Sequence, residues 1–351
     1  MADEINSNVE EQESSDELYE RFVFNADKGQ EPYRIDKFLM NRIENATRNK
    51  LQQAINAGLV LVNGKEVKQN YKIKAFDQII VYSDLSPEST DVVPEKLPLN
   101  IVHEDEHIII INKPPGLVVH PGSGNYNGTL LNGIAYHLRQ NNPSVTEETL
   151  PRFGLVHRID KNTSGLLVLA KTDKAMRQLA KQFYDHTVKR QYLALVWGDV
   201  QDDEGTIVAH VGRNLRHRKL FEAYPEGDHG KEAITHFKVV ERFNYVTLVQ
   251  CVLETGRTHQ IRVHMKHIGH PLFNDDFYGG DKIVKGTIFS KYKQFVDNCF
   301  AICPRQALHA KTLGFVHPGT EKEIFFESEL PEDIRKVIDK WRDYTKTLSS
   351  Q

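Results

Sequence analysis

The chain of 351 residues is predicted to have an α+β fold with two domains. Its length exceeds the usual size of a single hydrophobic core, and strand-like runs outnumber helical ones without regular βαβ alternation. We expect a larger domain with a largely antiparallel mixed β-sheet flanked by helices and loops, and a small domain of two helices and a hairpin. The expected segments are a disordered tail (1–20), the small domain (21–84), a linker (85–98) and the large domain (99–346).

Composition narrows the class of protein. Hydrophobic residues make up 39% of the chain and charged residues 26%, and no run reaches the roughly 18–20 apolar residues of a membrane-spanning helix. The acidic N-terminus lacks the basic start and the apolar centre of a signal peptide. The three cysteines are too few for a disulfide framework, and their spacing fits no familiar metal knuckle. We therefore expect a folded cytoplasmic protein.

Charge is distributed unevenly. The first twenty residues contain eight acids and no base, which predicts a disordered tail. Residues 34–82 contain nine Lys or Arg against four Asp or Glu. This excess fits either a nucleic-acid-binding surface or an ordinary solvated face, so charge alone does not decide between them.

The elements of the small domain follow from local patterns. Apolar residues recur at helical spacing in "RIDKFLMNRI", and Thr47 is a candidate N-cap for the next helix. Asn63-Gly64 is a typical turn of a two-residue hairpin. We expect helices over 35–43 and 48–58, a hairpin over 59–67 and a strand over 78–82.

The segments "RIDKFL" and "RNKLQQAINAGLVLVNG" resemble the small RNA-binding domain shared by a small-subunit ribosomal protein and tyrosyl-tRNA synthetases. Many pairs of helices followed by a strand look similar, so an ordinary structural module is the alternative. The resemblance implies contacts to RNA phosphates rather than reading of bases. The residues expected to make them are Arg34, Arg48, Lys50 and Lys65.

The large domain is predicted to contain many strands and few helices. "EHIIIINKPPGLVVHP" is read as a buried strand, a turn and a second strand that ends at His120-Pro121. Further strands are expected over 191–198, 234–243, 246–254 and 323–328, and helices over 130–138, 173–184, 257–269 and 331–346. The closing part of the domain begins with "RQALHAKTLGFVHP".

A polar segment, "HRIDKNTSG", interrupts two apolar runs within residues 154–172. Its single carboxylate, Asp160, stands two positions after Arg158. Alone, this pair is readily explained as an ion pair that stabilises a turn. The density of hydrogen-bonding groups between two expected strands also suits a functional loop.

A second polar group is expected at a helix start. Arg257, His259, Gln260 and Arg262 fall together where free backbone N–H groups favour an anion, although a capping cluster is the alternative. Histidines are frequent from residue 259 to 270, but no two are spaced i,i+4 and no zinc-enzyme motif is present. We therefore expect no metal site.

Four motifs, "HRIDKNTSGLLVLAKT", "RQYLALVWG", "LETGRTHQIRVH…GHPLFNDDFYGG" and "RQALHAKTLGFVHP", resemble in order those of pseudouridine synthases that modify large-subunit ribosomal RNA. "INKPPGLVVHP" resembles the segment that precedes them. The resemblance covers nearly all of residues 99–326. One departure is Asn162, where related sequences often have Asp; it is expected to tune activity and not to abolish it.

The resemblance implies an isomerase that detaches uracil from its ribose and rejoins it through carbon 5, without a cofactor. Asp160 is then the catalytic aspartate, as nucleophile or as base at carbon 2′. A buried carboxylate needs a cationic partner to stay ionised, and Arg262 matches that partner. Tyr192 matches a tyrosine that stacks on the base and helps to remove the proton from carbon 5.

The resemblance also implies substrate-binding residues. Arg158 matches the residue that helps to hold the target nucleotide out of its stack, since a paired base is unreachable. Leu308 matches an apolar contact under the uracil. The full expected set is Arg158, Thr163, Ser164, Arg257, His259, Gln260 and Leu308.

Other classes stay open at this stage. A non-catalytic RNA-binding or ribosome-assembly protein would have damaged active-site motifs, yet Asp160, Tyr192 and Arg262 are present. A hydrolase or metal enzyme would need a second acid near Asp160 or a ligand set. A transfer-RNA substrate fits the same motifs. We expect RNA as the partner, no membrane and a monomer.

Overall fold

The computed structural model of the chain describes residues 19–43, 48–56, 58–83, 92–122, 125, 127–215, 217, 220–287 and 289–349. The chain divides into two compact units, one mainly within Glu10–Asp91 and one mainly within Val92–Pro121 and Asn127–Gln351. The division falls inside the predicted linker. Residues 1–18 of the predicted tail, the candidate cap Thr47, and residues 85–91 lie outside the described residues.

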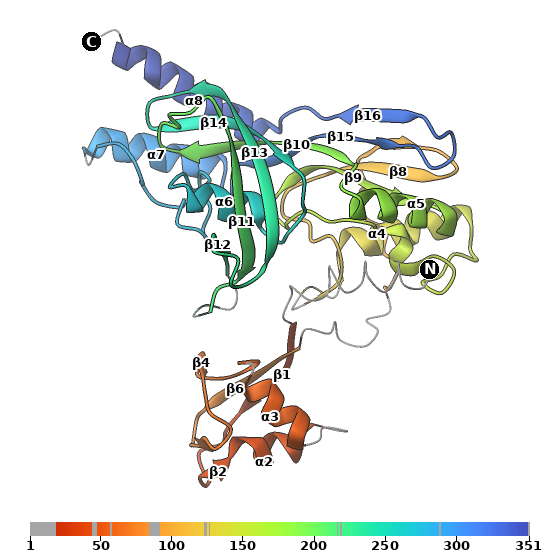
Figure 1. The fold of residues 1–351 in the computed structure, drawn as a ribbon, viewed down its shortest axis with the longest axis vertical. Coiled ribbons are helices and arrows are strands. Elements are labelled where there is room, and N and C mark those ends of the chain that lie inside the picture. The colour runs from red at the N-terminus through yellow and green to blue at the C-terminus, as the bar shows by residue number, and fades with distance from the viewer. Residues whose placement is uncertain are drawn as a thin grey trace. The chain divides into compact units, whose positions relative to one another are not determined.

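The described residues of the small unit form two helices, a four-stranded sheet in the order β1-β6-β3-β4, and the strand pair β2-β5 (Figure 1). Its elements are β1 (Tyr19–Asn25), β2 (Tyr33–Arg34), α2 (Ile35–Met40), α3 (Arg48–Asn56), β3 (Val60–Val62), β4 (Lys65–Glu66), β5 (Lys72–Ile73) and β6 (Gln78–Ser83). The two helices, the hairpin and the strand at 78–82 are confirmed. Strand β1 was not expected.

The hairpin β3–β4 forms because its turn residues tolerate left-handed backbone angles. Asn63 and Gly64 have φ values of 50° and 74°, as a tight turn between twisted strands requires. Phe38, Leu39 and Ile55 from the two helices are buried with residues of β3 and β6 in one core. The small unit therefore has its own hydrophobic centre.

The large unit is built on one ten-stranded sheet in the order β12-β11-β13-β14-β10-β15-β9-β8-β7, with β16 beside β15. Its strands are β7 (Ile101–Glu104), β8 (Ile108–Lys113), β9 (Ser164–Ala170), β10 (Lys189–Trp197), β11 (Glu204–Arg213), β12 (Phe221–Tyr224), β13 (Lys231–Arg242), β14 (Val246–Leu253), β15 (Leu308–Val316) and β16 (Glu323–Glu327). Neighbours are antiparallel except β15 and β9, which run parallel. The predicted largely antiparallel mixed sheet is confirmed.

The parallel contact between β9 and β15 depends on a glycine. Ser164 is paired with His309 and Gly165 with Ala310. Gly165 has a φ of 118°, and a Cβ atom there would lie 2.2 Å from the carbonyl oxygen of Ala310. Only glycine combines this backbone angle with so close an approach. The contact joins the β12–β10 side of the sheet to the β9–β7 side.

Helices cover the sheet. They are α4 (Leu130–Asn141), α5 (Asp173–Tyr184), α6 (Gln260–His267), α7 (Ser290–Ile302) and α8 (Glu332–Ser349), with a 3-10 turn, η1 (Pro151–Gly154). Helices α4 and α5 lie next to β8 and β9 (Figure 1). Helices α7 and α8 enclose a second core around Trp197 and Trp341. Within the described residues, no helix has the length and apolar character needed to cross a membrane.

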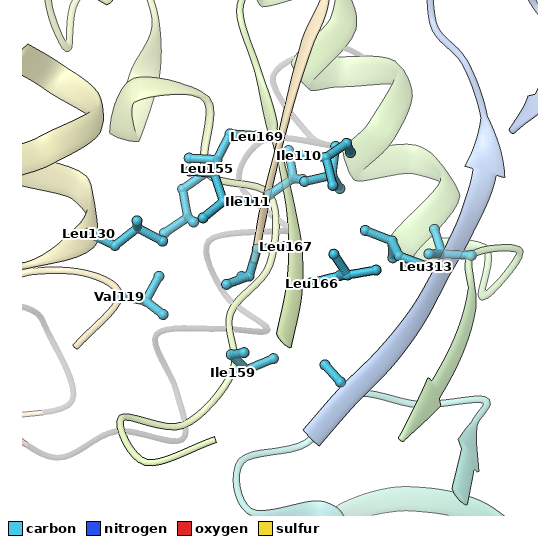
Figure 2. Packing of buried hydrophobic residues seen from close by; sticks show 14 of the residues in the cluster. Ile110, Ile111, Val119, Leu130, Leu155, Ile159, Leu166, Leu167, Leu169 and Leu313 are labelled. Carbon is cyan, nitrogen blue, oxygen red and sulfur yellow. The ribbon is translucent and has the colours of Figure 1, made fainter. Parts of the chain in front are cut away.

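The main core lies around β8 and β9, where side chains on both faces of the strands are buried. Figure 2 shows Leu166 pointing toward Leu313 of β15, whereas the neighbouring Leu167 lies toward Val119 and Leu130. Successive side chains of a strand point to opposite faces, so β9 contributes to packing on both sides of the sheet. The strand that follows Asp160 is therefore firmly fixed.

Two expected strands are corrected. The segment that ends at His120-Pro121 is a loop, because the carbonyl groups of Val118 and Val119 accept hydrogen bonds from the first N–H groups of α4 at 2.8 and 3.0 Å. The apolar run before Asp160 forms only the turn η1 and an isolated bridge between Leu155 and Leu169. Helix α7 and strands β7, β11, β12 and β15 were not expected.

Gly165→Ala is expected to lower the free energy of unfolding by about 2–5 kcal/mol, because it adds left-handed strain to a clash with backbone atoms. Urea unfolding followed by circular dichroism measures this loss. Gly269→Ala is the matched control, since Gly269 has a φ of 86° but nothing within 4 Å of an added Cβ. Equal losses in both variants would contradict a special role for the β9–β15 approach.

Candidate active site

Asp160 lies on the loop between η1 and β9. Its side chain is 22% exposed. The loop turns tightly at this residue, because the N–H of Thr163 donates to the carbonyl oxygen of Asp160 at 3.0 Å. The carboxylate is thus presented from a short, closed turn.

Two buried cations hold the next carbonyl groups of this loop. Lys113 Nζ donates to the carbonyl oxygens of Pro114, Leu117 and Lys161, each at 2.9 Å. Burial lowers the pKa of Lys113 to about 7, although the nearby Asp160 carboxylate opposes the shift. The ammonium group therefore joins the loop of Asp160 to the segment that follows β8.

Arg305 supports the loop from the other side. Its Nη1 donates to the carbonyl oxygen of Asn162 at 2.9 Å. The same guanidinium forms two hydrogen bonds with Asp333 at the start of α8, at 2.7 and 3.0 Å. The C-terminal helix is thereby connected to the residues beside Asp160. Sequence reasoning did not identify Lys113 or Arg305, because they reach the loop of Asp160 through the backbone of Lys161 and Asn162, which are far from them along the chain.

Arg262, on α6, contacts Asp160 with one nitrogen and a second carboxylate with two. Its Nη1 lies 3.0 Å from Asp160 Oδ2, while Nε and Nη2 donate to Asp275 at 2.8 and 2.9 Å. Asp275 is fully buried and also accepts the N–H groups of Phe277 and Tyr278. The expected contact between Arg262 and Asp160 is present, but the bidentate partner is Asp275.

Asp275 was missed by sequence reasoning. The signal for it was the motif "GHPLFNDDFYGG", whose two adjacent acids follow the helix that carries Arg262. A planar guanidinium cannot rotate freely when it donates hydrogen bonds to both oxygens of one carboxylate. Asp275 therefore sets the direction in which Arg262 Nη1 points.

These charges determine the ionisation of Asp160. Burial would raise its pKa, but His259 in its protonated form and the guanidinium groups of Arg262 and Arg158 outweigh burial, so the pKa of Asp160 lies below its usual value. The carboxylates of Asp275 and Asp160 raise the pKa of Arg262, although burial opposes the rise. Asp160 is an anion at neutral pH, as expected from the need for a cationic partner.

His259 faces the second oxygen of Asp160. Its Nε2 lies 3.9 Å from Asp160 Oδ1, and its Nδ1 lies 2.7 Å from the hydroxyl of Tyr278. That hydroxyl accepts the N–H of Phe221 at 3.2 Å, so its own proton is available for His259 Nδ1. Burial lowers the pKa of His259 to about 4, so the imidazole is neutral and carries its hydrogen on Nε2, toward Asp160.

Tyr192 and Leu308 lie on adjacent strands. Tyr192 of β10 is paired with Ala310 of β15, and Ala194 is paired with Leu308. Both side chains are buried. Burial raises the pKa of Tyr192, with a smaller contribution from Asp160, while Arg190 opposes the rise. The phenol is therefore protonated at neutral pH and lies within electrostatic influence of Asp160.

Three of the expected substrate-binding residues are used inside the protein or hidden from solvent. Gln260 accepts from Thr255 Oγ1 and from the N–H of Arg257, and donates to Ile234 O and Thr235 Oγ1. Ser164 Oγ lies 3.0 Å from His309 Nδ1. The third, Thr163, is 1% exposed.

Arg158 and Arg257 border the site. Arg158 Nη1 lies 3.4 Å from His120 Nε2, and the charge of Arg158 contributes to the low pKa of Asp160. Arg257 Nε donates to the carbonyl oxygen of Glu232 at 3.0 Å. Helix α6 begins at Gln260 rather than at Arg257, so Arg257 lies in the turn before the helix.

In the small unit, two of the expected RNA-binding residues share one buried carboxylate. Arg34 donates two hydrogen bonds to Asp36, at 3.0 and 2.9 Å, and Arg48 Nε donates to it at 3.1 Å. The hydrogen bond from Arg34 is the main cause of a pKa of Asp36 far below its usual value. Lys65 is exposed on the hairpin, and the side chain of Lys50 lies outside the described residues.

The histidines near α6 have partners other than metal. His264 Nδ1 lies 3.0 Å from Thr235 Oγ1, and His270 Nδ1 lies 2.8 Å from the carbonyl oxygen of Trp197. Within the described part of the chain, no group of three or more His, Cys, Asp or Glu side chains is placed to hold a metal ion.

The sequence of the chain was compared with known proteins and matches one family over the residues that form this site. Residues 107–267 match the family described as RNA pseudouridylate synthase. A protein of Chlorobaculum parvum named "Uncharacterized RNA pseudouridine synthase" is 44% identical over 316 residues, which cover 90% of this chain and 96% of that protein. This chain belongs to the RNA pseudouridine synthase family. The predicted family resemblance and the predicted isomerase class are confirmed.

Further relatives and one solved structure agree. Proteins named "Ribosomal large subunit pseudouridine synthase D" from Zymomonas mobilis and Neisseria meningitidis serogroup B are 39% and 42% identical over 308 and 305 residues. The alignments cover 87% of this chain in both cases, and 93% and 78% of those proteins. "Human RNA Pseudouridylate Synthase Domain Containing 4" matches with a TM-score of 0.55 and 22% identity over 69% of this chain and 93% of that chain, which supports the fold alone.

The small unit of this pseudouridine synthase is also assigned. Residues 34–79 match the S4 domain family. This confirms the resemblance to a small RNA-binding domain. The roles of individual residues in both units stay predictions.

Asp275→Ala is expected to lower the free energy of unfolding by roughly 3–5 kcal/mol, because the buried guanidinium of Arg262 loses its bidentate partner. Urea unfolding of the full chain measures the change. The double variant Arg262→Met/Asp275→Leu removes both charges and should recover most of the loss. A single variant as stable as wild type would show that Asp275 does not support Arg262.

Proposed function

We propose that this pseudouridine synthase converts uridines of large-subunit ribosomal RNA to pseudouridine, with Asp160 as the catalytic carboxylate. The observation that carries the proposal is the ion pair between Asp160 Oδ2 and Arg262 Nη1 at 3.0 Å, on a loop beside Tyr192. The ribosomal substrate is supported by the names of relatives 39–42% identical to most of this chain.

The reaction breaks the bond between nitrogen 1 of uracil and the ribose, and forms a bond between carbon 5 and the same ribose carbon. The proton leaves carbon 5 and nitrogen 1 gains one, so the nucleotide keeps its composition. An ionised carboxylate serves this chemistry either by attacking the sugar or by removing the proton at carbon 2′. Both roles require an ionised carboxylate, and the lowered pKa of Asp160 keeps it ionised in spite of burial.

The two oxygens of Asp160 are suited to different tasks. Oδ2 accepts the hydrogen bond from Arg262, while Oδ1 faces His259 Nε2 at 3.9 Å, beyond hydrogen-bonding distance. We assign Oδ1 to the ribose. The neutral His259 can then approach with an N–H donor, without cancelling the negative charge that the reaction needs.

Tyr192 and Leu308 are assigned to the uracil ring. They lie on adjacent strands near the level of Asp160, so a base turned out of its stack can lie against the tyrosine with the leucine beneath it. The raised pKa of Tyr192 keeps the phenol protonated, which favours stacking over removal of the carbon 5 proton.

The remaining expected residues divide into two groups. We assign Arg158, Arg257 and His259 to the substrate, since they border Asp160 or the turn before α6. Gln260 and Ser164 are assigned to support, because their polar atoms already have protein partners. The buried Thr163 supports the loop turn through its N–H group.

We assign the S4 domain to contacts with RNA phosphates through Arg34, Arg48, Lys50 and Lys65. Asp36 fixes the guanidinium groups of Arg34 and Arg48 relative to each other.

The three cysteines of the chain are buried thiols, which suits a reducing compartment. We therefore propose that the enzyme acts in the cytoplasm.

Asp160→Asn is expected to abolish pseudouridine formation while changing RNA affinity only a few-fold, because the amide cannot replace the anion and many phosphate contacts share the binding. Pseudouridine mapping of total RNA from cells with the wild-type chain, the variant or neither measures this. Modified uridines confined to transfer RNA would contradict the ribosomal substrate, and turnover by the variant would contradict the role of Asp160.

The pH profile tests the partner of Asp160. In the wild type, the pKa of Asp160 is lowered, so activity should hold at mildly acidic pH and fall only as pH drops through that low value. Arg262→Met removes the cation but leaves burial, so the acid limb of its residual activity should move to higher pH. Single-turnover rates measured from about pH 4 to 8 should be nearly flat for the wild type and show an acid limb for the variant. Coincident profiles would mean that Arg262 does not control this ionisation.

A further inference from the structure

Arg190, on β10, is a buried guanidinium without the partner that such a group needs. The residue is 8% exposed, and its Nε has no hydrogen-bond acceptor among the described residues. The other two buried arginines of this unit are each paired bidentately, Arg262 with Asp275 and Arg305 with Asp333. Arg190 has no such ion pair in the described part of the chain.

Arg190 lies against an aromatic ring and a glycine of the turn before α6. Its guanidinium lies 5.4 Å from the centre of the Phe183 ring. Its Nη1 lies so close to Gly256 that a Cβ atom at that position would approach it to 2.9 Å. Burial lowers the pKa of the nearby His157 and His186, and the charge of Arg190 lowers both pKa values further. The group therefore lies under the turn before α6, among side chains that do not neutralise it.

The energetics favour a missing ligand over a purely structural role. A buried ion without compensation is strongly destabilising, and arginine cannot avoid this cost by losing its proton. The cation–π contact with Phe183 offsets only part of the cost. Burial lowers the pKa of Arg190, as expected for a cation held away from water. A bound anion would remove the remaining cost.

The position of Arg190 indicates which anion. Alternate residues of a strand share a face, so Arg190 and Tyr192 point to the same side of β10, about 7 Å apart along the strand. Tyr192 is assigned to the target base, and every nucleotide of RNA carries a phosphodiester close to its base. A guanidinium can donate two parallel hydrogen bonds to phosphate oxygens.

We propose that Arg190 binds a phosphodiester of the RNA, either that of the target uridine or that of the adjoining nucleotide, beneath the Thr255–Arg257 turn. The proposal rests on the proposed function, since Tyr192 is placed at the base by that assignment. Arg190 is a substrate-binding residue in this scheme. It holds the backbone of the turned-out nucleotide while Asp160 acts on the sugar.

The test is a cycle of protein and RNA changes. An RNA that the wild-type chain modifies is prepared with single neutral methylphosphonates at each phosphate around the target uridine. One neutral position should weaken wild-type binding roughly ten- to hundredfold, as loss of a charge-assisted contact predicts. Arg190→Met should lose a similar factor on normal RNA, and nothing more on that neutral RNA. If the loss caused by Arg190→Met multiplied with the loss caused by the neutral phosphate at every position, no phosphate would be coupled to Arg190. That result would overturn the proposal.

A second measurement separates ligand binding from a role in folding. Without RNA, Arg190→Met should unfold at the same temperature as the wild type or a higher one, because it removes an uncompensated charge. Arg305→Met is the matched control, since it leaves the partly buried Asp333 without its bidentate partner and should unfold at a lower temperature. A fall for Arg190→Met equal to that of the control would overturn the proposal.

Salt dependence gives an independent check. The slope of log affinity against log salt should become shallower by about 0.7 in Arg190→Met, as for one lost contact to single-stranded nucleic acid. An unchanged slope would overturn the proposal. These measurements use affinity and not turnover. A wild-type chain that forms no pseudouridine in ribosomal RNA would contradict the proposed function, while the cycle would still report on Arg190 with any RNA that the chain binds.

Discussion

The close approach of β9 and β15 is the constraint on which the active site depends. At Gly165 the two backbones are nearer than any side chain would allow, and this parallel contact is what joins the two sides of the sheet. Asp160 lies just before β9, Leu308 at the start of β15, and Tyr192 on β10 beside it. One backbone contact thus brings together residues from three distant segments.

Charge is arranged around this junction in alternation. Asp275, Arg262 and Asp160 form a row of acid, base and acid, with a fourth group, His259, on the free oxygen of Asp160. The inner carboxylate fixes the guanidinium, and the guanidinium keeps the outer carboxylate ionised. Arg190 departs from this pattern, because no carboxylate in the described part of the chain is paired with its guanidinium. RNA carries a negative charge on each of its phosphates and can therefore supply the anion that Arg190 lacks.

Much of this could be predicted from the sequence, because strands, helices and turns have local signals. The Asn63-Gly64 hairpin and helix α5 could be predicted because each depends on residues close together in the sequence. The motifs around Asp160, Tyr192 and Arg262 indicated the resemblance to the family. The rest depends on contacts between distant segments. Val118 and Val119 have a strand-like sequence but cap α4, Asp275 acquires its role only opposite Arg262, and the lack of a partner for Arg190 is visible only after folding.

The place of β15 in the chain has a consequence for synthesis of the enzyme. This strand separates β9 from β10 in the sheet, yet it is formed by residues 308–316, and the Asp333 that holds Arg305 comes later still. Domains generally fold in the order in which they leave the ribosome. The S4 unit can fold early, whereas the centre of the catalytic sheet must wait for nearly the whole chain. A nascent chain can therefore acquire its RNA-binding module well before it acquires a working active site.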